Sequence, residues 1–116
     1  MLNWSELQSA DQLEQIKLES LITPIVIFKH STRCNISSMV KDRLERKWNM
    51  INVPVKAYYL DLINYREISN QIATDFEIQH ESPQMLIISS GDCRFHSSHN
   101  EIDVNQILDQ LKILQN

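Results

Sequence analysis

The chain has 116 residues, of which 42% are hydrophobic and 22% charged, and its formal net charge at pH 7 is −4. This length and composition predict one globular domain over residues 1–116 with its own hydrophobic core. The net acidic surface argues against nucleic acid as a general partner. The N-terminus lacks a basic start followed by an apolar run, and no apolar run is long enough to span a membrane, so we expect a cytoplasmic protein.

The first half of the chain is expected to alternate helix and strand. Ser9 and Gln12 have the spacing of a capping box and predict a helix that begins after Ser9. The short, β-rich run 25–28 is typical of a strand that is buried on both faces. Apolar residues then recur every four positions from 36 to 48, which predicts an amphipathic helix over about 34–48.

The second half is expected to add three strands and two helices. The predicted strands are 55–60, 85–88 and 93–96, and the predicted helices begin near Asn64, with Glu67 in capping-box spacing, and after Asp103. Gly91 and Asp92 are typical of a hairpin turn. Helical crossovers imply parallel strands, and the hairpin adds an antiparallel edge. The order predicts an α/β, thioredoxin-like fold with a mixed four-stranded central sheet, flanking helices and an N-terminal extension helix.

Cys34 is expected where the loop after the buried strand meets the start of a helix. The unpaired amides and the positive dipole end of a helix N-terminus favour a thiolate over a thiol. Lys29, His30 and Arg33 add positive charge nearby. We therefore expect Cys34 to be a reactive cysteine that ionises more readily than an ordinary thiol. The alternative is a buried structural cysteine. The residues that flank Cys34 are polar, which argues against this alternative.

Ser37 lies three residues after Cys34, on the same helix face. Its hydroxyl is expected to support the thiolate, together with the backbone at Asn35 and Ile36. Ser37 also stands where a dithiol protein has its second cysteine, so this site could attack a disulfide but would need an external thiol to release the product. The alternative is an ordinary exposed serine in a first helical turn.

Pro83 precedes a predicted strand and is expected to approach Cys34. In this layout the Ser82–Pro83 bond is expected to be cis and to leave the backbone at Ser82 free to pair with an extended substrate, although base rates alone favour trans. Cys93 is interpreted as a passive strand residue, with a resolving thiol as the alternative. The four histidines have no ligand spacing, and no metal site is predicted.

Two segments carry a resemblance to a known family. Residues 28–37 (FKHSTRCNIS) and 80–84 (HESPQ) are similar to the cysteine and proline segments of the monothiol bacilliredoxins, thioredoxin-like redox proteins of the bacillithiol system. The resemblance implies removal of bacillithiol from mixed disulfides during oxidative stress, with Cys34 as the attacking residue and Pro83 as the cis-proline. It implies no cofactor, because bacillithiol is the co-substrate. The family usually has proline directly after the cysteine; Asn35 instead leaves an N–H available to the thiolate.

The partners implied are bacillithiol and bacillithiolated client proteins, with the chain itself a monomer. Bacillithiol carries carboxylates, which favours cationic partners. The residues predicted to contact the substrate are Lys29, Thr32, Arg33, Ser82 and Pro83. An alternative function is that of a binding protein without turnover, namely a monothiol glutaredoxin-like iron–sulfur or thiol-carrier protein. The Gly-Phe pair that marks those proteins is absent from this sequence. A non-catalytic adaptor of the same fold is a third alternative.

Overall fold

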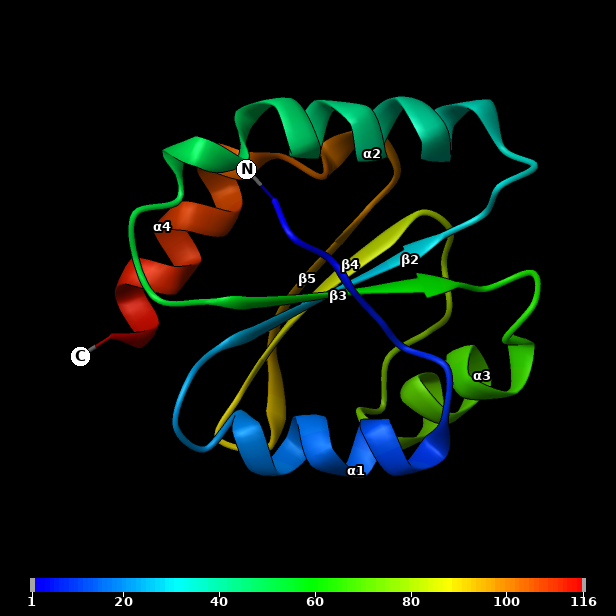
Figure 1. The fold of residues 1–116 in the computed structure, drawn as a ribbon, viewed down its shortest axis with the longest axis horizontal. Helices are drawn as coiled ribbons and strands as arrows, with labels where there is room; N and C mark the ends of the chain where they lie inside the picture. The colour runs from blue at the N-terminus through cyan, green and yellow to red at the C-terminus, as the bar shows by residue number, and fades with distance from the viewer. Residues whose placement is uncertain (1, 116) are drawn as a thin grey trace.

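The computed structural model describes residues 2–115. A central five-stranded sheet lies between two layers of helices (Figure 1). The strands are β1 (Ser5–Glu6), β2 (Ile25–His30), β3 (Lys56–Asp61), β4 (Gln84–Ser89) and β5 (Asp92–Ser98). The helices are α1 (Ala10–Glu19), α2 (Asn35–Lys47), α3 (Arg66–Asp75) and α4 (Val104–Leu114), with short 3-10 turns after α2 and β5. In Figure 1, α2 and α4 cover one face of the sheet, and α1 and α3 cover the other.

The strand order is β1-β3-β2-β4-β5. β2 lies at the centre, parallel to β3 and antiparallel to β4, and β5 continues the antiparallel edge. The mixed α/β sheet was therefore predicted correctly. The prediction of four strands was wrong by one, because β1 pairs in parallel with Tyr58 and Tyr59 of β3. A two-residue strand is too short to show any hydrophobic periodicity.

Alternate residues of β2 enter two separate cores. Val26 and Phe28 face α2 and α4, where they pack among Val40 and Leu44. Ile27 and its neighbours of the same parity face α1 and α3. Full burial of one such side chain stabilises the fold by about 1.5–3 kcal/mol. These two cores fix the end of β2, and with it the loop that leads to Cys34.

The helix starts show where local sequence signals hold and where they fail. Ser9 caps α1 by accepting a hydrogen bond from the Gln12 amide at 3.2 Å, as predicted. The expected capping role of Asn64 was wrong: its side-chain amide donates to Asp61 at 2.7 Å, and α3 begins two residues later. None of the helices within residues 2–115 is long and apolar enough to cross a membrane.

Candidate functional site

Cys34 is the N-cap residue of α2. Its amide donates to the Ser31 carbonyl at 3.2 Å, and its carbonyl accepts the first helical hydrogen bond, from the Ser38 amide, at 3.1 Å. The first amides of a helix have no partner within the helix, and they point toward the cap together with the positive end of the dipole. The half-buried thiol makes no capping hydrogen bond. The backbone therefore provides donors for a negatively charged sulfur at this position.

The residues around Cys34 are open to solvent. Thr32 and Arg33 precede it and are exposed, and Asn35 follows it and is exposed as well. Ile36 adds an apolar group that is 43% exposed. A partner can thus approach the sulfur from solvent and meet both a cationic and an apolar side chain next to it.

The Ser82–Pro83 segment lies beside the same end of the sheet. Lys29 of β2 pairs with Gln84 of β4, so the register places Pro83 next to the last residue of β2. The Ser82–Pro83 peptide bond is cis. The Ser82 hydroxyl is buried and has no hydrogen-bond partner among residues 2–115. The cysteine segment therefore follows the end of β2, and the proline segment precedes β4, the strand next to it.

Lys29 does not lie where a substrate could reach it, and its predicted role as a substrate contact was wrong. β2 extends two residues beyond the apolar run, which places Lys29 inside the strand with its side chain fully buried on the α3 side. Its ammonium donates to the Ser69 carbonyl at 3.2 Å and lies 3.3 Å from His80 Nδ1. Burial lowers the pKa of Lys29 to about 8.

Ser37 is also placed differently from the prediction. It is fully buried, and its Oγ lies 2.6 Å from His30 Nδ1 and accepts a hydrogen bond from the Ser31 amide at 3.0 Å. Within the described residues, the structure records no hydrogen bond between Ser37 and the Cys34 sulfur. Ser37 is thus neither an exposed first-turn serine nor a direct partner of the sulfur in this conformation.

Cys93 cannot act as an internal resolving thiol. It pairs with Ile88, which in turn pairs with Ile25 at the start of β2, whereas Cys34 follows the end of that strand. Six strand residues span about 17–20 Å, well beyond the roughly 7 Å between α-carbons that a disulfide allows. Burial raises the pKa of the Cys93 thiol to about 11. The interpretation of Cys93 as a passive strand residue agrees with this position.

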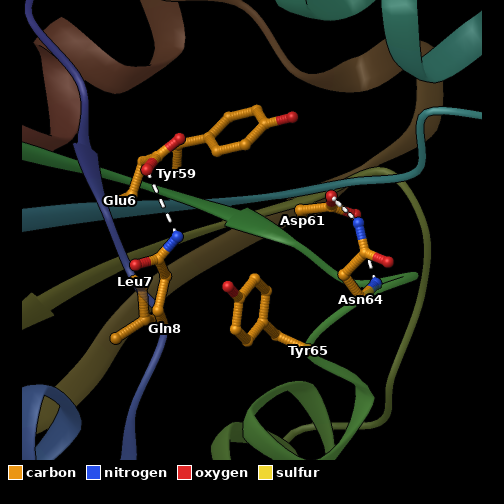
Figure 2. A pocket seen from close by; sticks show the side chains of 7 residues that line it. All are labelled: Glu6, Leu7, Gln8, Tyr59, Asp61, Asn64 and Tyr65. Carbon is orange, nitrogen blue, oxygen red and sulfur yellow. Dashed lines mark hydrogen bonds between the residues drawn. The ribbon is translucent and has the colours of Figure 1, made fainter.

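A polar pocket of about 240 Å³ lies beside β1 and the end of β3 (Figure 2). Its lining residues are Glu6, Leu7, Gln8, Tyr59, Asp61, Asn64 and Tyr65. Gln8 donates to Glu6 at 3.2 Å and Asn64 to Asp61 at 2.7 Å, so these polar groups largely satisfy one another (Figure 2). Residue spacing could not predict this pocket, because residues 6–8 and 59–65 meet only when β1 pairs with β3.

Similar solved structures share this architecture. One, described as an oxidoreductase candidate with a thioredoxin fold, is 29% identical with a TM-score of 0.79, covering 92% of this chain and 91% of that chain. The thioredoxin of Trypanosoma brucei brucei is 17% identical with a TM-score of 0.77, covering 98% and 93%. Chloroplastic thioredoxin z is 18% identical with a TM-score of 0.72, covering 99% and 96%.

The fold and the cysteine at the start of α2 define a thiol redox protein of the thioredoxin-like class. The family model of the monothiol bacilliredoxin BrxC matches residues 5–107. The chain therefore belongs to the monothiol bacilliredoxin family, as the resemblance of its cysteine and proline segments indicated.

Proposed function

We propose that this protein removes bacillithiol from mixed disulfides on client proteins, with Cys34 as the nucleophile. The observation that carries the proposal is the position of Cys34: a half-buried thiol at the N-cap of α2, with serine three residues later where a second thiol would stand. Membership of the monothiol bacilliredoxin family supports the choice of bacillithiol as co-substrate. Because the reaction needs a pool of reduced thiol, we place it in the cytoplasm.

The proposed reaction consists of two disulfide exchanges. In the first, the Cys34 thiolate attacks the bacillithiol sulfur of the mixed disulfide. A new S–S bond forms, the old one breaks, and the client sulfur leaves as a thiolate that takes a proton from water. In the second, the thiolate of free bacillithiol attacks this new disulfide and leaves as bacillithiol disulfide, which returns Cys34 to the thiolate.

The groups around Cys34 have distinct proposed roles. Arg33 is a cation available to a carboxylate of bacillithiol, and Thr32 offers a hydroxyl beside it. The backbone at Ser82, next to Pro83, is proposed to pair with the extended client segment. Lys29 has no place in this scheme because it is buried on the α3 side of the sheet.

The direct test offers a bacillithiolated protein to the reduced enzyme and follows transfer by intact mass and peptide mapping. Wild type and Cys93→Ser are expected to acquire one bacillithiol on Cys34, and Cys34→Ser is expected to acquire none. Undiminished removal of bacillithiol from the client by Cys34→Ser would refute the proposal, as would an adduct confined to Cys93.

The proposed role of Arg33 can be tested by substitution, with Arg46 of α2 as the matched control. An exposed ion pair contributes up to about 1 kcal/mol, so Arg33→Ala is expected to lower kcat/KM by roughly 2- to 5-fold. Arg46→Ala removes the same charge at the far end of α2, where the side chain is 71% exposed and pairs with Asp42. Equal effects of the two substitutions would assign the loss to net charge and remove Arg33 from the site.

A further inference from the structure

A buried histidine and serine form a pair next to the reactive end of α2. The pair consists of His30, at the end of β2, and Ser37, in the first turn of α2, with 2.6 Å between Nδ1 and Oγ. Ser37 is fully buried and His30 is 5% exposed. The two exchange steps of Cys34 do not use either side chain. A buried titratable group therefore contacts a side chain that lies one helical turn after Cys34.

The hydrogen-bonding capacity of Ser37 limits what this pair can do. A serine hydroxyl has one hydrogen to donate and two lone pairs that accept. The Ser31 amide occupies one lone pair at 3.0 Å. If His30 Nδ1 carries no hydrogen, Ser37 donates to it and keeps one lone pair free. If Nδ1 carries a hydrogen, His30 fills that second lone pair, and the hydroxyl hydrogen must point to another acceptor.

Cys34 is the neighbour that can complete both arrangements. It stands three residues before Ser37, and N-cap side chains ordinarily face the second and third residues of the helix. The half-buried thiol makes no capping hydrogen bond. For the sulfur to reach Ser37, the side chain of Cys34 must rotate about its Cα–Cβ bond. A thiol would donate to the free lone pair of Ser37, and a thiolate would accept its hydrogen.

We propose that Ser37 couples the charge on Cys34 to the protonation of His30. In the neutral arrangement, the Cys34 thiol donates to Ser37 and Ser37 donates to His30 Nδ1. When both hydrogens move one position along this chain, the S–H bond and the original O–H bond break, and a new O–H bond and an N–H bond form. The products are a Cys34 thiolate, an intact serine hydroxyl and a His30 imidazolium. His30 is thus a positioning residue that acts on the sulfur through Ser37.

The charges that face His30 set the pH range of this coupling. Asp61, opposite His30 on β3, and Glu45 on α2 favour the imidazolium, while Lys41 on α2 disfavours it. The Tyr59 ring on β3 packs with its centroid 5.6 Å from that of the His30 ring. Burial, followed by Lys41, lowers the pKa of His30 below its usual value of 6.5. The coupling is therefore expected to operate on the acidic side of neutrality.

The experiment is an NMR titration of the histidine rings in two forms of the protein. One form is fully reduced, and in the other Cys34 is capped as a methyl disulfide, which carries no charge. Linked groups shift each other's titration, so His30 is expected to titrate about one pH unit higher in the reduced protein. His96 and His99 are exposed, and their ring signals serve as internal controls that are expected to be the same in both forms.

Substitutions separate the coupling from a structural role. Ser37→Ala is expected to abolish the difference between the reduced and capped forms, whereas Ser38→Ala, at the next and exposed position, is expected to preserve it. His30→Asn keeps an amide near the Nδ1 position but does not titrate. It is expected to convert a two-step pH profile of Cys34 alkylation into a single step. An unchanged two-step profile in His30→Asn would contradict the coupling even if Ser37→Ala did not fold.

The inference rests on Cys34 being the reacting thiol of the proposed function, yet the two fail separately. No bacillithiol is present in the NMR titration. Absence of bacillithiol transfer with a shifted His30 titration would refute the proposed function alone. Normal transfer with identical His30 titrations in the reduced and capped protein would refute the coupling alone.

Discussion

Replacement of the buried Lys29 by methionine is expected to stabilise the protein at pH 7. The Lys29 side chain is fully buried between β2 and α3. Its ammonium contacts the Ser69 carbonyl and His80, and neither carries a negative charge. The Ser69 carbonyl keeps its helical hydrogen bond without the lysine. Methionine has a similar length and no charge, so Lys29→Met removes a desolvated cation without opening a large cavity.

The magnitude follows from the pKa of Lys29. Burial lowers that pKa from 10.5 to about 8. The difference corresponds to at most about 3.4 kcal/mol at 1.36 kcal/mol per pKa unit. Between these values the unfolded chain binds the proton more readily than the folded one, so stability rises with pH. The penalty is fully present below pH 8 and is relieved as the pH rises toward 10.5. Allowing for relaxation around the ammonium, we expect wild type to gain about 2 kcal/mol relative to Lys29→Met between pH 7 and pH 10.

Urea unfolding at pH 7 and at pH 10 measures this difference. Other groups titrate over the same range, but they are common to both proteins and cancel when the two unfolding free energies are subtracted. Lys47→Met, at an exposed position near the end of α2, is the matched control and is expected to show a difference that does not change with pH. If the advantage of Lys29→Met at pH 7 persisted undiminished at pH 10, the reasoning from desolvation would be wrong.

Two further predictions concern single side chains outside the site. Burial raises the pKa of the Cys93 thiol from 9.0 to about 11. Cys93 is therefore expected to react with iodoacetamide at pH 7.5 about 100-fold more slowly than a cysteine in a short peptide. Mass spectrometry measures the two rates, and equal rates would show that the thiol is not shielded. Ser9→Ala removes the cap of α1 and is expected to lower the unfolding free energy by about 1 kcal/mol. Ser38→Ala is the control with an expected change within about 0.5 kcal/mol, and a similar loss in both variants would contradict the capping role.

Local interactions made the elements predictable. The cap of α1 involves residues three apart, Ser9 and Gln12, and the four-residue spacing from Ile36 onward defines α2 without reference to any other part of the chain. The position of Cys34 at the start of α2 follows from the same local pattern. The buried run that precedes it indicated a central strand, which β2 is.

The sequence was less informative about which side chains would be buried at the end of that strand. An apolar run predicts a strand covered on both faces, but it does not show where burial ends. β2 continues through Lys29 and His30 because β3 and β4 pair with its last residues. Lys29 consequently points to the α3 side instead of toward a substrate.

The sequence by itself determined that Cys34 lies at a helix start, because capping and periodicity depend on residues within one or two turns of each other. Only the tertiary structure decided what surrounds it. The pairing of β1 with β3 and the contact between His30 and Ser37 depend on how strands and helices pack. Such contacts depend on the register of strand pairing and on the face that each side chain occupies, and neither can be predicted from the spacing of residues along the chain.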